Sequence, residues 1–149
     1  MHDVLTPGLT ATVSGPYGMF DFTLGDRHQV WIAGGIGVVP FLNWLRTLTP
    51  DDDYSIDLFY SVPTEADAVY LPELTAHGVR LPSVRMRSVF TRTQGHLPGG
   101  DVIDAVAVPA AGVHAFLCGP AAMVSDITRD LRRRGVPRDY IHAEQFSFR

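Results

Sequence analysis

Apolar residues along the chain fall into short blocks with two different spacings. Residues 30–33 form a continuous apolar run that ends at Gly34-Gly35, whereas 41–48 repeats apolar residues every three or four positions. The first spacing is typical of a buried strand and the second of a helix that packs on a sheet. A similar apolar run predicts a strand at 113–117, and residues that alternate between two faces predict strands at 56–60 and 84–90. A fifth strand is predicted at 140–148.

Helical segments are predicted between these strands. Pro40 and Pro120 each follow a strand and suit the first turn of a helix, where a missing N–H leaves no hydrogen bond unmade. The connection 65–77 is expected as two short pieces because a proline interrupts it, and another short helix is expected at 101–106. In the helix after Pro120, the core-facing spacing is carried by Met123, Val124, Ile127 and Leu131.

Strands that alternate with helices predict an α/β fold in which a parallel sheet lies between two layers of helices. Ligands of such open sheets bind beyond the carboxyl ends of the strands. The segments with unusual chemistry follow strands in this way, and they are the turn 33–40, the tripeptide Cys118-Gly119-Pro120 and the chain end 144–149. The sequence therefore predicts a ligand site at that edge of the sheet.

Composition limits the kinds of partner. The 149 residues suffice for one domain with its own core, and a formal net charge of −4 gives no general attraction for nucleic acid. The single cysteine excludes an internal disulfide, and the six histidines show no spacing typical of a metal site, so none is predicted. No apolar stretch approaches the roughly 20 residues that cross a membrane, and we expect a soluble cytoplasmic chain, or one at the cytoplasmic face of a membrane protein.

The turn 33–40, with the sequence AGGIGVVP, has the composition of a phosphate-binding loop. Glycines let backbone N–H groups approach a pyrophosphate closely, and the helix that follows adds a partial positive charge. A tight turn without a ligand is the alternative. Pro40 stands where the usual dinucleotide fingerprint has its third glycine, which disfavours an ordinary Rossmann dehydrogenase.

Several other residues can be interpreted either as structural residues or as parts of a binding site. Cys118 is either a packing residue of the core or a residue beside a cofactor. Phe148 either closes the core or belongs to a site, and Arg92 is either a surface arginine or a phosphate contact. The run 132–134 consists of arginines and is interpreted as the last turn of a helix, where cations complement the helix dipole.

Five segments together resemble one family. Their order and spacing resemble those of the nucleotide-binding domain of the ferredoxin–NADP reductase superfamily. The five segments are GPYG at 15–18, AGGIGVVP at 33–40, FYSVPT at 59–64, CGP at 118–120 and E-x-F at 144–146. The glycine motif and the ending look closest to ferric reductase-like and NADPH oxidase-like members. The resemblance implies a Rossmann-like, five-stranded parallel sheet of order 3-2-1-4-5.

The resemblance also implies a role for each motif residue. The pyrophosphate would be held by Gly34, Gly35, Gly37 and Pro40. The nicotinamide would be bordered by Cys118 and Gly119, with Glu144 as the acidic residue near that cysteine, and Phe146 would stack on the flavin ring. Ser61 and Pro120 would join the nucleotide contacts, and Thr91 and Arg92 would receive the 2′-phosphate of NADPH.

Two positions depart from the pattern of the family. Val39 stands where a threonine is common, so it donates no hydroxyl hydrogen bond to a cofactor. Pro63 replaces an arginine that many relatives place after the second strand, which weakens the case for NADPH that Thr91 and Arg92 make. Thr91 and Arg92 still favour NADPH over NADH, and both remain candidate cofactors.

The function implied is that of one half of a flavin-dependent oxidoreductase. Residues 25–149 would be the NAD(P)-binding domain, and 1–24 a linker with the end of a missing FAD-binding barrel. Hydride would pass from NAD(P)H to FAD and then to ferric iron, haem or an iron–sulfur protein. The barrel and an electron acceptor would be partners, with a haem-bearing membrane domain as a further candidate. A non-catalytic NAD(P)H-sensing module is the alternative, against which Cys118 and Glu144 argue.

Overall fold

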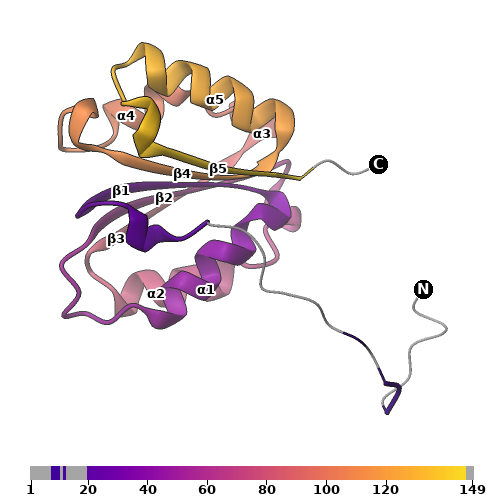
Figure 1. Ribbon diagram of the computed structural model, residues 1–149. Helices are drawn as coiled ribbons and strands as arrows, with labels where there is room; N and C mark the ends of the chain where they lie inside the picture. The colour runs from indigo at the N-terminus through magenta and orange to yellow at the C-terminus, as the bar shows by residue number, and fades with distance from the viewer. Residues whose placement is uncertain (1–7, 11, 13–19, 147–149) are drawn as a thin grey trace.

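Five parallel strands form the centre of the protein, and helices cover both of their faces (Figure 1). The computed structural model describes residues 8–10, 12 and 20–146. The strands lie in the order β3-β2-β1-β4-β5, which confirms the predicted fold and strand order. Their bounds are β1 His28–Gly34, β2 Ser55–Val62, β3 Val84–Phe90, β4 His114–Pro120 and β5 Ile141–Phe146.

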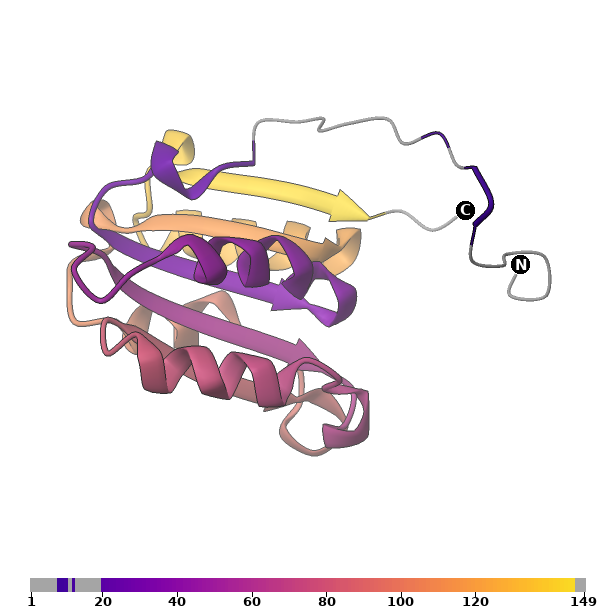
Figure 2. The same ribbon diagram turned by 90° about the horizontal axis from the view of Figure 1, so that it is seen from below.

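The helices form two layers (Figures 1 and 2). Helices α1 (Val39–Thr47) and α2 (Leu71–Arg80) cover one face of the sheet, and α4 (Gly99–Asp104) and α5 (Ala121–Arg133) cover the other. The short α3 (Thr91–Gln94) directly follows β3. The 3-10 turns are η1 Phe22–Leu24, η2 Gly35–Val38, η3 Glu65–Asp67, η4 Ala110–Gly112 and η5 Arg138–Tyr140.

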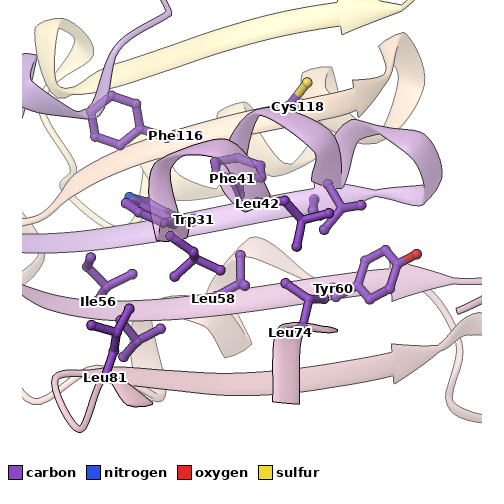
Figure 3. Close-up of a cluster of buried hydrophobic side chains, with 14 of the residues drawn as sticks. Trp31, Phe41, Leu42, Ile56, Leu58, Tyr60, Leu74, Leu81, Phe116 and Cys118 are labelled. Carbon is purple, nitrogen blue, oxygen red and sulfur yellow. The ribbon is translucent and has the colours of Figure 1, made fainter. Parts of the chain in front are cut away.

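The core is divided by the sheet into two apolar clusters. On the α1 face, Trp31 stacks on Phe41 with ring centroids 5.6 Å apart, and both rings are fully buried (Figure 3). On the α5 face, Ile32 and Leu117 pack with Ile127. Successive residues of β1 therefore enter opposite clusters, which is why the strand is apolar throughout rather than alternating.

The element boundaries differ slightly from those predicted. Helix α1 begins at Val39, one residue before Pro40, because the 3-10 turn η2 leads directly into it. The connection 65–77 does form two pieces, η3 and α2, and Pro72 lies in the first turn of α2 instead of inside it. The predicted helix at 101–106 is α4 and lies two residues earlier. Met123 is only partly buried, unlike its core-facing neighbours on α5.

Some predictions fall outside the described residues. The segment 15–18, which contributed to the family resemblance, and Phe148 both lie there. In the part of the chain that the structure describes, no helix combines the length and the apolar composition needed to cross a membrane.

Candidate functional site

The carboxyl ends of the strands meet at one edge of the sheet, where a cavity of about 530 Å³ opens. The cavity lies against the turns that follow β1, β2, β3 and β4. It is lined by Gly34, Gly35, Ser61, Val62, Pro63, Thr91, His96, Leu97, Pro120, Ala122, Met123, Asp126 and Ile127. Much of this lining is apolar, and polar groups are few, as in many cofactor sites.

Two glycine-containing segments pack against one another beside this cavity. They are called the glycine turns here and are Gly34-Gly35 at the end of β1 and Gly119-Pro120 at the end of β4. A Cβ atom added to Gly119 would lie 3.0 Å from the Cα atom of Gly34, so the turn after β4 touches the turn after β1. Gly35 has a φ of +54°, which favours glycine, and the space where its Cβ would stand is empty. The backbone around Gly35 is therefore open to a ligand.

Gly37 makes a packing contact that the resemblance did not imply. It is buried, and an added Cβ would overlap the carbonyl oxygen of Cys118. Gly37 thus lets η2 pack on the end of β4 and is not among the residues that line the cavity. Gly37 thereby brings the ends of β1 and β4 close together.

The helix starts at this edge leave backbone N–H groups available. Pro120 is the N-cap of α5 and Gly34 that of η2, and no side chain in the described part of the chain caps either start. The first N–H groups of a helix lack partners within it and attract anions. Pro40 lies at the second position of α1, half-buried and outside the cavity lining.

Cys118 and Glu144 lie opposite one another in the register of β4 and β5. Cys118 is fully buried on the α1 face and lies at the margin of the apolar cluster (Figure 3). Burial, with a smaller contribution from Glu144, raises the pKa of the Cys118 thiol to about 12. The side chain is thus a neutral thiol at physiological pH, and Glu144 beside it is half-buried.

The ends of β2 and β3 form the far end of the cavity. Ser61, Pro63 and Thr91 line it, and the backbone N–H of Arg92 donates to the carbonyl oxygen of Pro63 at 3.0 Å. This bond joins the two loops. The Arg92 side chain is exposed and does not line the cavity, so the structure separates the two members of the predicted pair, Thr91 and Arg92.

Five of the predicted residues line the cavity, and the others do not. The lining contains Gly34, Gly35, Ser61, Thr91 and Pro120. Gly37, Cys118 and Gly119 form the packed layer beneath the turns. Phe146 ends β5 in register with Pro120, which places its backbone at the same edge.

Sequence reasoning did not identify the rest of the lining. Ala122, Met123 and Asp126 line the cavity from the first turns of α5, where the sequence pattern identifies only Met123, as a core-facing residue. The local sequence could have indicated this face, since residues 122, 123 and 126 share one side of a helix. His96 and Leu97 follow α3 and carried no comparable signal.

The residues at this edge fit a dinucleotide. A parallel sheet with two packed glycine turns, free helix N–H groups and an adjacent cavity defines the class of nucleotide-binding α/β domains. Residues 31–129 match the family described as "Oxidoreductase NAD-binding domain". This chain belongs to that family, within the ferredoxin–NADP reductase superfamily that the motifs predicted.

Relatives of known name agree with this assignment. The chain is 32% identical to the propane 2-monooxygenase reductase component of Mycolicibacterium smegmatis, over 91% of this chain and 42% of that protein. It is 30% identical to NADH-cytochrome b5 reductase 1 of Mortierella alpina, over 88% and 48%. The fold resembles that of a flavohemoglobin from Malassezia yamatoensis, with a TM-score of 0.75 at 23% identity over 90% of this chain and 36% of that one.

The chain spans less than half the length of these relatives. They support the superfamily, and they do not specifically support the ferric reductase-like branch that the glycine motif and the ending suggested.

Proposed function

We propose that this chain binds NAD(P)H at the carboxyl edge of its sheet and presents it to a flavin that another domain holds. The observation that carries the proposal is the contact between the two glycine turns, beside free helix N–H groups and a cavity of about 530 Å³. Close backbone approach and a partial positive charge are what a pyrophosphate needs.

The order of the strands would give the nucleotide a direction along this edge. The turn after β1 lies in the middle of the sheet, and Gly35 would receive the pyrophosphate there with the start of α5. Ser61 and Thr91 would contact the adenosine on the β2–β3 side. Cys118 and Glu144 would border the nicotinamide on the β4–β5 side.

NAD(P)H, when bound, supplies the hydride that a flavin accepts. The chain's own residues bind and orient. A neutral Cys118 thiol adds no charge at the nicotinamide, whereas the Glu144 carboxylate would stabilise the positive charge that develops on the ring as hydride leaves. Phe146, by the family resemblance, would cover the flavin ring until the nicotinamide displaces it.

We further propose that NADH is preferred to NADPH. The 2′-phosphate of NADPH adds negative charge, which proteins usually receive with arginine or lysine. The described residues that line the cavity include no arginine or lysine. They do include an acidic residue, Asp126, which would repel a phosphate. Arg92 is exposed and lies outside the lining, and Pro63, which lines the cavity, is uncharged.

The flavin would be held mainly by an FAD-binding domain outside residues 25–149, with residues 1–24 as the linker to it. The small share of each relative that the chain covers supports this division. The names of the relatives, a monooxygenase reductase component and a cytochrome b5 reductase, suggest an iron–sulfur or haem protein as the electron acceptor.

Hydride transfer distinguishes this function from the sensing of NAD(P)H without turnover. With the flavin-bearing domain added, stopped-flow absorbance would measure flavin reduction by NADH. We expect Cys118→Ala and Glu144→Gln each to slow reduction about tenfold, equal to roughly 1.4 kcal/mol of barrier, with little change in nucleotide affinity.

Gln145→Ala is the matched control, since Gln145 is exposed and points to the opposite face of β5 from Glu144. It should reduce flavin at the rate of the unmodified protein. A protein that binds NADH and never reduces the flavin would be a sensor. If Cys118→Ala lowers only the melting temperature, Cys118 is a packing residue.

A further inference from the structure

A second groove lies away from the nucleotide cavity, between α5 and the outer strand β5. Its volume is about 860 Å³, and its wall comes from the polar side of α5. Its floor consists of Ile141, Ala143 and Gln145, alternate residues of β5 that share one face. The groove is lined by Ser125, Thr128, Arg129, Arg132, Arg133, Arg138, Ile141, Ala143 and Gln145.

The charge of this groove is opposite to that of the whole chain. The formal net charge is −4, yet four of the nine lining residues are arginines and none is acidic. Arg129 pairs with Asp126 at 2.7 Å, and Arg133 lies 3.5 Å from Asp130. Among the described residues, no carboxylate lies within 4.0 Å of Arg132 or Arg138.

The edge of β5 is free in the described residues, because β5 pairs with β4 alone. A free edge presents a row of backbone N–H and C=O groups to which an extended chain can add as a further strand. The other outer strand, β3, also carries arginines, but Asp57 neutralises Arg85 at 2.6 Å and lies 3.8 Å from Arg87. Of the described arginines that flank the two outer strands in these contacts, Arg132 and Arg138 beside β5 are the ones without a carboxylate, in contrast to Arg85 and Arg87 on β3.

We propose that the β5 groove binds an extended acidic polypeptide segment, which adds to β5 as a sixth strand. The alternate side chains of such a strand would face α5, where Arg132 and Arg138 would receive carboxylates. A folded acidic surface could meet the arginines but would leave the groove and the strand edge unfilled. Pairing of β5 with β5 of a second copy would bring like charges together, which disfavours that occupant.

Fluorescence anisotropy with two labelled ten-residue peptides tests the proposal on this chain. One peptide alternates glutamate with valine, and the other alternates glutamate with proline, which keeps the charge and cannot pair as a strand. We expect the valine peptide to bind about tenfold more tightly than the proline peptide. Amide hydrogen exchange of residues 141–145 should slow only with the valine peptide.

Arginine variants locate the binding. The double variant Arg132→Glu/Arg138→Glu should weaken the valine peptide about tenfold. Arg27→Glu/Arg92→Glu makes the same change in net charge at exposed positions outside the groove and should bind nearly as the unmodified protein does. Melting temperatures of both variants verify folding. Equal binding of the two peptides, equal losses in the two double variants, or no binding at millimolar peptide would overturn the proposal.

Discussion

His142 shows how burial of one titratable side chain makes the fold sensitive to pH. Its ring stacks on Phe116 at a centroid distance of 4.6 Å and lies 5.9 Å from the ring of His114. Burial, and then the neighbouring His114, lower the pKa of His142. The folded protein therefore favours the neutral ring.

We expect the free energy of unfolding to fall as the pH falls below about 6.5, the pKa of a histidine in an unfolded chain. From there down to the lowered pKa of the folded state, the unfolded chain binds a proton that the folded protein does not. Urea unfolding at pH 7.5 and at lower pH would measure this dependence. In His142→Phe, which keeps an aromatic ring against Phe116, the dependence should be smaller. An identical pH dependence in both proteins would contradict the assignment.

Nucleotide preference also depends on single residues. Calorimetric titration should show tighter binding of NADH than of NADPH, and Arg92→Ala should change neither, because Arg92 lies outside the cavity lining. Pro63→Arg adds a cation at the adenosine end and should tighten NADPH about tenfold while leaving NADH nearly unchanged. Tighter NADPH binding in the unmodified protein that is lost in Arg92→Ala would instead support the 2′-phosphate role for Arg92.

At the scale of elements, two glycines differ in how much room their surroundings leave for a side chain. Gly37 in η2 leaves no room for a Cβ, since one would overlap the backbone of Cys118 at the end of β4. Gly78 lies inside α2, where an added Cβ would be at an ordinary 3.7 Å from the sulfur of Met86. Gly37 therefore allows η2 to pack on β4, whereas Gly78 only makes helix α2 less stable.

Thermal or urea unfolding would separate these roles. Gly37→Ala should destabilise the protein by about 1–3 kcal/mol because the turn must move away from β4. Gly78→Ala should stabilise it by about 0.5–1 kcal/mol, since alanine favours the helix interior. Equal effects of the two changes would show that η2 tolerates a side chain and that its packing on β4 is not tight.

The order of elements was predictable from the sequence, whereas contacts between distant elements were not. Apolar spacing and prolines marked the strands and most helices, because these signals are local. The contact of Gly37 with Cys118 joins residues far apart in the chain, so the motif alone could not predict it. The exposure of Arg92 and the lining by Asp126 depend in the same way on how loops and helices meet.

At the scale of the whole molecule, the strand order places the candidate nucleotide site at one edge of the sheet. The glycine turn after β1, the turn after β4 and the loops after β2 and β3 converge only because the strands are parallel. The Arg-lined groove lies at the outer strand β5, so an acidic partner and a nucleotide would occupy different sites.

Binding of NADH by two glycine variants, measured by isothermal titration calorimetry, tests the central claim most directly. Gly35 and Gly135 both have positive φ and open space around an added Cβ, but only Gly35 lines the cavity. Each alanine substitution should cost a similar backbone strain of about 1 kcal/mol. We expect Gly135→Ala to bind NADH as the unmodified protein does and Gly35→Ala to bind at least about tenfold more weakly. Unchanged affinity in Gly35→Ala would contradict a nucleotide site at this turn.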